Sequence, residues 1–167
     1  MTHPTDYQHC RDAIRSGDLL AWSHTGWKTW TDWKIQAVRF FTQSEYAHVG
    51  LAMVFGGRVW VLEAVKPVVR IVPLSNLLPA YWVHLPVKWT WNAEEYAFSL
   101  VGKAKYSEWE AIKAYFGRNV NGEAWQCAEL VHAVLQQCGL HLPCLDTPAE
   151  MVKAAQKLGG VVLLEES

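Results

Sequence analysis

The stretch QSEYAHVGLAMVFGGRVWVLEAV, residues 43–65, has the pattern of two β-strands joined by a tight turn at Gly56-Gly57. Apolar side chains fill most of both arms, as expected for strands that face a core. His48 and Glu63 are the exceptions, because they stand where a plain hairpin would carry aliphatic residues. This stretch therefore predicts both a central hairpin of the fold and a polar pair within it.

The spacing of the hairpin predicts that the two polar residues share one face. With the turn centred on the two glycines, Phe55 lies opposite Arg58 and Gly50 lies opposite Glu63. His48 and Glu63 are then diagonal neighbours, and Gly50 leaves the space between them open. A turn longer by one residue would place them on opposite faces of the sheet. Each residue alone is typical of an ordinary polar strand position, but the pair favours a histidine oriented by a carboxylate.

A histidine held by a carboxylate is half of a nucleophilic site, and Cys127 is the candidate for the other half. Residues 123–139, EAWQCAELVHAVLQQCG, form the best-patterned helix of the chain, closed by a glycine. Its apolar stripe includes Cys127 and is spaced as one helical face: Cys127, Leu130, Val131, Val134, Leu135 and Cys138. Near the start of a helix, unpaired N–H groups favour a thiolate, whereas Cys138 at the other end is better interpreted as core. A small buried hydrophobe remains the alternative for Cys127.

The chain as a whole predicts a single domain over residues 1–167 of the α+β class, with helices packed on a mostly antiparallel sheet. Short strands and helices alternate without repeats or a linker. The further elements that we expect are strands at 16–22, 69–78 (broken by Pro73), 81–87 and 161–166, and helices at 31–43, 92–102 (capped by Asn92), 107–117 and 147–159 (capped by Thr147).

Composition narrows the class of partner. The net charge of −1 gives no basic surface for nucleic acid or anionic membranes, and no segment approaches the ~20 apolar residues that span a bilayer. The N-terminal residues lack the apolar run of a signal peptide, so we expect a cytoplasmic, soluble protein with reduced cysteines. We expect no cofactor and no metal. Zinc on Cys138, His141 and Cys144, with His132 nearby, is disfavoured because Pro143 and the helix end make convergence awkward.

The motifs of this chain resemble those of a known family over nearly its whole length. They follow one another in that family's order: GDLL (17–20), FTQSEYAHVGL (41–51), VWVLEAV (59–65), VVRIVPLSNLL (68–78), GKAKY (102–106), QCAELV (126–131) and TPAEM (147–151). This order is similar to that of permuted NlpC-type cysteine hydrolases, the YiiX/YebB-like group, which is related to the lecithin:retinol acyltransferase-like proteins. The chain has CAEL where CSEL is common, and alanine where serine often precedes the histidine.

The resemblance implies a circularly permuted papain-like fold and a catalytic triad. Cys127 would be the nucleophile, His48 the base and Glu63 the residue that orients it, in acyl transfer from an amide of a small peptide, including a cell-wall peptide. Tyr46, which strand alternation places on the same face as His48, and Tyr106 are candidate hydroxyl donors beside them, although an ordinary packed tyrosine is the alternative for both. The alternatives are a hydrolase or acyltransferase for lipid esters and amides, and a non-catalytic binding module whose cleft uses some of the ten tryptophans.

Overall fold

The computed structural model describes residues 4–23, 46–65, 68–102, 127–142 and 147–166. A seven-stranded sheet forms its centre, in the order β1-β7-β6-β2-β3-β4-β5. Of the pairs in this sheet, β1 with β7 is parallel and the others are antiparallel. The strands are β1 (Pro4–Asp6), β2 (Leu19–Ser23), β3 (Tyr46–Phe55), β4 (Arg58–Val65), β5 (Val68–Pro73), β6 (Ala80–Val83) and β7 (Val161–Glu165). The expected α+β class with a mostly antiparallel sheet is confirmed.

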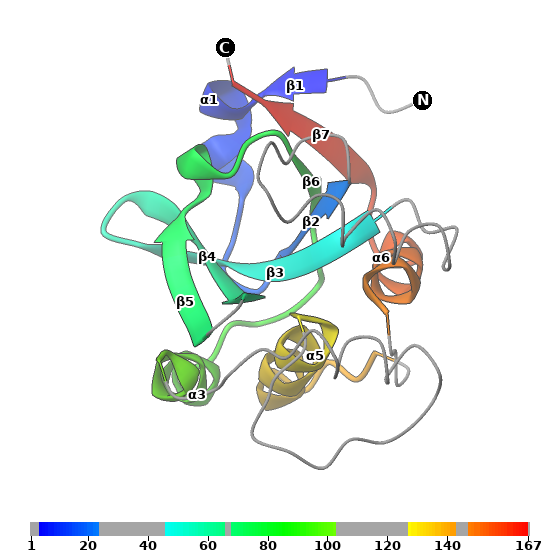
Figure 1. The fold of residues 1–167 in the computed structure, drawn as a ribbon. Helices are drawn as coiled ribbons and strands as arrows, with labels where there is room; N and C mark the ends of the chain where they lie inside the picture. Colours follow the sequence, from blue (N-terminus) through cyan, green and yellow to red (C-terminus); the bar gives the residue numbers. More distant parts are fainter. Residues whose placement is uncertain (1–3, 24–45, 66–67, 103–126, 143–146, 167) are drawn as a thin grey trace.

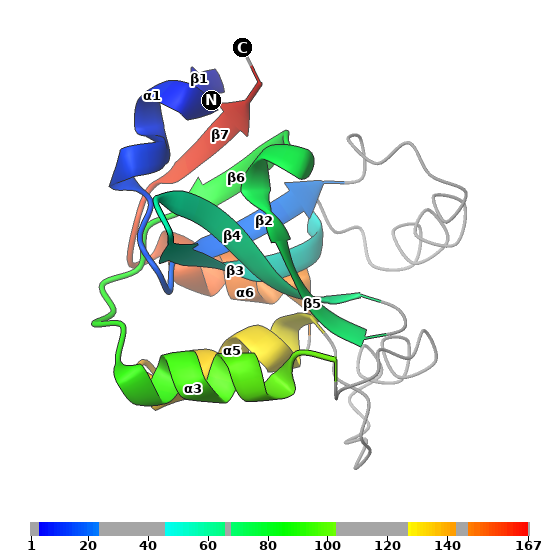
Figure 2. The same ribbon diagram turned by 90° about the vertical axis from the view of Figure 1, so that its left-hand side faces the viewer.

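The helices within the described ranges are distributed unequally over the two faces of the sheet. The three longer ones, α3 (Trp91–Leu100), α5 (Cys127–Gln137) and α6 (Pro148–Gln156), lie on the same side of the sheet in Figures 1 and 2. The short helix α1 (Tyr7–Cys10) lies away from these three helices, as do the 3-10 turns Arg11–Ala13 and Leu74–Asn76. Both α5 and α6 pack against β3. The central hairpin is therefore the strand pair on which the helical layer rests.

Two hydrophobic cores result, one on each face of the sheet. Alternate residues of the strands, such as Leu51 and Leu62, pack with the apolar stripe of α5 and with α6. The intervening residues, such as Ala52 and Val61, pack with Trp22 and the segments near α1. This alternation follows from the two-residue period of strands whose faces are both covered.

The hairpin has the register that the sequence predicted. Phe55 pairs with Arg58, and the pairing continues to Leu51 opposite Leu62. Beyond that pair lies Gly50, where an added Cβ would stand 3.4 Å from the Cβ of Glu63 and 2.9 Å from the Leu62 carbonyl oxygen. Gly50 is thus required for close approach of the two strands next to Glu63.

The ends of several elements can be compared with expectation. Helix α6 begins as predicted, with the Thr147 hydroxyl accepting from the Glu150 N–H and Pro148 in the first turn. The predicted cap Asn92 is wrong: α3 begins at Trp91, and its cap is Thr90, whose hydroxyl accepts from the Ala93 N–H at 3.1 Å. Thr90 has the extended backbone that a cap needs, whereas Asn92 already lies inside the helix.

Strand boundaries are set by local chemistry in a similar way. Pro73 ends β5, which is an edge strand of the sheet, and a 3-10 turn follows. This position suits proline, because it has no N–H group to donate to a neighbouring strand. Strand β6 ends at Val83, before Pro86, although β6 is an interior strand. The expected strand near the C-terminus is confirmed as β7. The N-terminal strand β1 and helix α1 were not expected.

Some predictions fall outside the described residues. They are the helices at 31–43 and 107–117, the residues of the 123–139 helix that precede Cys127, Tyr106 and Cys144.

Candidate active site

His48 and Glu63 meet across the hairpin as the spacing predicted. His48 Nε2 lies 2.7 Å from Glu63 Oε2. The Glu63 side chain is fully buried, and that of His48 is 12% exposed. A carboxylate this close fixes the ring orientation and favours the charged imidazole.

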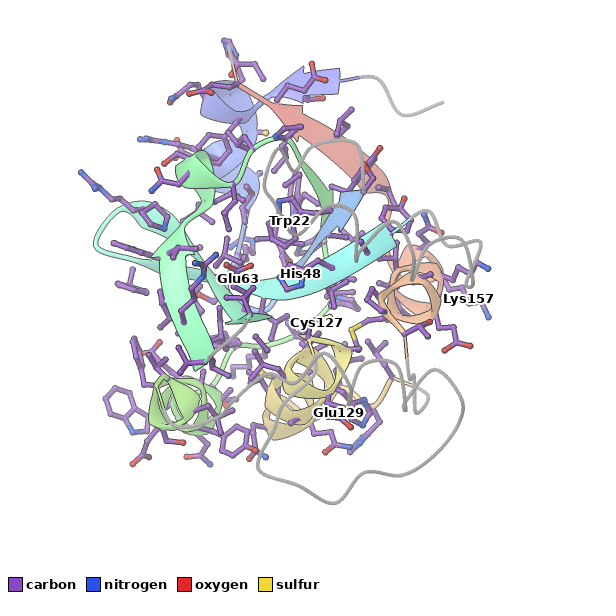
Figure 3. All side chains as sticks on the ribbon, in the orientation of Figure 1. Trp22, His48, Glu63, Cys127, Glu129 and Lys157 are labelled. Atoms are coloured by element: carbon purple, nitrogen blue, oxygen red, sulfur yellow. The ribbon has the colours of Figure 1, made fainter. Side chains whose placement is uncertain are left out.

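Cys127 completes the group from the other layer of the fold. It is the first residue of α5, it is buried, and its thiol side chain is hydrogen-bonded to the His48 imidazole. Because Nε2 is engaged by Glu63, Nδ1 is the ring nitrogen left for the thiol. Figure 3 shows Glu63 and His48 together beside β3, with Cys127 at the nearby end of α5. The structure thus brings together all three residues that the sequence singled out.

Arg70 is a fourth member that the sequence analysis missed. It stands directly opposite Glu63 in the pairing of β4 with β5. Its Nε and Nη2 lie 2.8 and 2.7 Å from Glu63 Oε1, while its side chain is 44% exposed. The sequence held a signal for this pairing, since only two residues separate β4 from β5 and a short connection restricts the register of antiparallel strands. The prediction for residues 69–78 was limited to a strand broken by Pro73.

The ionisation of the site follows from these contacts. Burial alone would lower the pKa of His48, but hydrogen bonds to Cys127 and Glu63 and their charges outweigh it and raise the pKa to about 10. Burial likewise opposes the charge on Glu63, yet hydrogen bonds and attraction from His48 and Arg70 hold the pKa of this carboxyl below its usual value. At neutral pH the imidazole is therefore charged, and it lies between two groups that favour that charge.

Trp22 supports the other side of the imidazole. It pairs with His48 between β2 and β3, and the two ring centroids are 5.4 Å apart at an interplanar angle of 38°. The indole is held in turn by a 2.7 Å hydrogen bond from its Nε1 to the Leu77 carbonyl oxygen. An aromatic face next to a charged ring adds a favourable cation–π contact and limits its rotation.

A bulge next to His48 changes the direction of Tyr46. Ser23 pairs with Tyr46 and Trp22 with His48, so that Ala47 is an extra residue in β3. Tyr46 consequently packs in the core that the sheet shares with α5 and α6, edge-on against Tyr81 with centroids 5.2 Å apart. The expectation that Tyr46 shares the face of His48 is wrong, because simple alternation does not hold across a bulge.

The structure contains a second buried carboxylate beside a histidine, with a different character. Asp18 is fully buried and accepts hydrogen bonds from the N–H groups of Arg15 and Leu85 and from the Trp82 indole, while His84 Nδ1 lies 2.9 Å away. These contacts tie the start of β2 to the end of β6. The Asp18 carboxylate thus connects parts of the scaffold.

Exposed aromatic residues gather away from this site. Phe55 stacks on Trp60 with centroids 5.1 Å apart, and Phe98 of α3 lies 5.8 Å from Phe55. Phe55 and His48 are seven residues apart in β3, which separates them by roughly 23 Å at the usual rise of a strand. Among the described residues, the aromatic surface and the Cys-His-Glu group are therefore separate features.

No protein-family model matches the sequence, and no curated protein matches it. Among solved structures, the chain is similar to the crystal structure of the metalloprotein yiiX from Escherichia coli O157:H7, DUF1105, with a TM-score of 0.57 and 18% sequence identity. The match covers 90% of this chain and 88% of yiiX. This likeness shows a shared fold, which agrees with the expected papain-like architecture. Membership of the NlpC-type hydrolases stays a prediction.

Proposed function

We propose that this protein is a cysteine hydrolase that cleaves an amide bond, such as that of a small peptide or cell-wall peptide, by acyl transfer to Cys127. The observation that carries the proposal is the His48 imidazole, which is held by the buried Glu63 carboxylate on one side and hydrogen-bonded to the Cys127 thiol on the other. A nucleophile, a base and a group that orients the base are the parts that such chemistry needs.

In the proposed reaction the Cys127 thiolate attacks the substrate carbonyl carbon and forms a C–S bond. The backbone N–H of Cys127, at the first residue of α5, is the donor proposed for the oxyanion. The His48 imidazolium gives its Nδ1 proton to the leaving amine as the C–N bond breaks. Neutral His48 then takes a proton from water, whose hydroxide attacks the thioester, and the acid product and Cys127 are released.

The charge state of His48 fits the first half of this cycle. With its pKa raised to about 10, the imidazole carries the proton at neutral pH and stands beside the sulfur as a cation. A neighbouring imidazolium favours the thiolate, which is the nucleophilic form of cysteine. The site is thus prepared for attack before substrate binds.

The alternatives use the same three residues or none of them. A lipid ester or amide would pass through the same thioester, so hydrolase and acyltransferase differ only in the acceptor that releases the acyl group. A binding module that relies on aromatic side chains would not need a thiol and an imidazole in contact. The separation of the described aromatic cluster from His48 also favours chemistry at Cys127 over binding by those aromatics.

A metal ion has no place in the proposal. The solved relative yiiX is called a metalloprotein. Within the described ranges of this chain, no three His, Cys, Asp or Glu side chains are grouped so that they could hold a metal ion. The arrangement of His48 between two hydrogen-bond partners is that of an acid–base group rather than of a ligand.

No helix within the described ranges is long and apolar enough to cross a membrane.

Active-site labelling tests the proposal directly. Purified protein is treated with iodoacetamide at pH 7, and the modified cysteines are identified by mass spectrometry. We expect Cys127 to react much faster than Cys138 and Cys10, because burial raises the pKa of both other thiols. A Cys138→Ser variant, matched in chemistry but outside the site, should keep this reactivity, and Cys127→Ser should lose it.

A substrate screen then separates the candidate reactions. Muropeptides, peptides with blocked ends and short acyl esters are incubated with the wild type, and the acyl-enzyme is sought by intact mass. We expect an adduct on the wild type and on Cys138→Ser, none on Cys127→Ser, and turnover of at least one amide substrate by the wild type. Full activity of Cys127→Ser on any substrate found would contradict the hydrolase proposal.

A further inference from the structure

We propose that Arg70 is a positioning residue of this site: it keeps Glu63 ionised and turned toward His48, and it thereby sets the lower pH limit at which Cys127 reacts. This inference deepens the proposed function and rests on it. It is carried by the geometry of the Glu63 carboxylate, whose two oxygens are shared between Arg70 and His48.

The two partners of Glu63 divide its oxygens without overlap. Both guanidinium contacts, from Nε and from Nη2, go to Oε1, and the imidazole contact goes to Oε2. Two donors of one planar guanidinium on the same oxygen restrain the position of that oxygen. The other oxygen is then held where His48 Nε2 meets it at 2.7 Å. Arg70 therefore acts on the imidazole through Glu63.

The charges along this line of contacts alternate. Arg70 is positive, Glu63 negative and the His48 imidazolium positive, and the Cys127 thiolate of the proposed mechanism is negative. Glu63 is fully buried, so its charge depends on these neighbours rather than on water. Without Arg70 the remaining three groups carry a net negative charge, and a proton taken up by Glu63 relieves it. A neutral Glu63 carboxyl would no longer stabilise the imidazolium.

The sheet explains how a partly exposed arginine reaches a buried acid. Arg70 and Glu63 are paired residues of neighbouring strands, so their side chains leave the sheet side by side. Arg70 lies on β5, the last strand of the sheet, with 44% of its side chain exposed. The aliphatic part of the Arg70 side chain can thus lie against the sheet, while its guanidinium contacts the Glu63 carboxylate from the edge strand.

The test compares Arg70→Gln with Arg70→Lys, and uses Arg58→Gln as a matched control on an exposed arginine at the start of β4. Proteins carrying 13C-labelled glutamate are titrated by NMR, and the Glu63 carboxyl signal is followed. In parallel, the iodoacetamide rate at Cys127 is measured against pH. We expect Arg70→Gln to raise the titration midpoint of Glu63 by one pH unit or more, a tenfold or larger gain in proton affinity. The acid limb of Cys127 labelling should move in the same direction.

The remaining variants show whether charge or shape matters. Arg70→Lys keeps the charge without the double contact, so it should restore most of the Glu63 midpoint and only part of the labelling rate. Arg58→Gln should match the wild type in both measurements. If Arg70→Gln does not fold, the same comparison is made between Arg70→Lys and the wild type, where an unchanged labelling rate would overturn the double-contact argument.

Two results separate this inference from the proposed function. An unmoved Glu63 midpoint and an unmoved acid limb in folded Arg70→Gln would overturn the role of Arg70, even if the protein proves to be a hydrolase. A raised Glu63 midpoint in a protein that neither forms an acyl-enzyme nor labels at Cys127 would instead overturn the hydrolase proposal. The NMR titration needs no substrate, so it reports on Arg70 in either case.

Discussion

The substitution Glu63→Gln removes one charge from the buried site while keeping the shape of the side chain. In the wild type the pKa of His48 is raised from 6.5 to about 10 by Cys127 and Glu63 together, against the cost of burial. An opposite charge at hydrogen-bonding distance commonly accounts for about one to three pH units of such a rise. We therefore expect the midpoint of His48 in Glu63→Gln to fall to between about 7 and 9.

The same substitution is also expected to lower the free energy of unfolding. The sign follows from the linkage between proton binding and folding. A raised pKa means that folded His48 binds a proton that the unfolded chain has released, so its contribution is complete below about pH 6.5 and is lost as the pH rises through about 10. The full rise corresponds to at most about 5 kcal/mol, at about 1.4 kcal/mol per unit. Losing one to three units in Glu63→Gln removes about 1 to 4 kcal/mol of unfolding free energy near neutral pH.

Two measurements check this prediction. The His48 ring is titrated by NMR, which follows the protons on its ring carbons Cε1 and Cδ2. The unfolding free energy is measured with urea at pH 7. A control variant, Glu165→Gln, removes an exposed acid from β7 of the same sheet. It should change the free energy of unfolding by no more than about 0.5 kcal/mol and should leave the His48 midpoint in place. A His48 midpoint that stays near 10 in Glu63→Gln would refute the reasoning, because the carboxylate would then not support the imidazolium.

Three further predictions follow from the described contacts. Gly50→Ala should cost about 1 to 3 kcal/mol of unfolding free energy, since its Cβ would press on the Leu62 carbonyl oxygen and on Val61, whereas Gly160→Ala, with nothing within 4 Å, should cost much less. Alkylation of Cys127 should proceed at an appreciable rate well below pH ~8.5, where a free cysteine is half ionised, and a rate that rises only above that pH would contradict the ion pair. Thr90→Ala should cost about 1 kcal/mol by urea unfolding through loss of the α3 cap, and Asn92→Ala less than half of that.

The hairpin and its polar pair were predictable because their geometry is local. A two-glycine turn fixes the register of the adjacent strands, and the register fixes which side chains share a face. His48 and Glu63 therefore met as expected. Tyr46 did not follow, since Ala47 is an extra residue opposite β2 and nothing in the sequence marks a bulge without a glycine.

The contribution of long-range packing was harder to predict. Periodicity placed Cys127 on the buried stripe of α5, but its contact with His48 depends on how the helix crosses the sheet, which no spacing within the helix specifies. The resemblance to a family supplied that step. Arg70 could have been found from the register of β4 and β5, whereas the contacts of Asp18 with Trp82 and His84 join strands that are far apart in sequence.

The two buried carboxylates among the described residues, Asp18 and Glu63, show why one of them points to chemistry. Asp18 accepts backbone N–H groups at a strand end, so its charge satisfies donors that the fold would otherwise leave unpaired. Among the described residues, Glu63 is hydrogen-bonded to two side chains, those of Arg70 and His48. An apolar group of similar volume on β4 would often serve stability equally well or better. What this costly arrangement provides is a charged imidazole of fixed orientation whose second nitrogen faces a thiol at the start of a helix. Stability gives no reason for that combination, whereas acyl transfer requires it, and a loss of Cys127 reactivity in Glu63→Gln larger than the loss of stability would measure the difference.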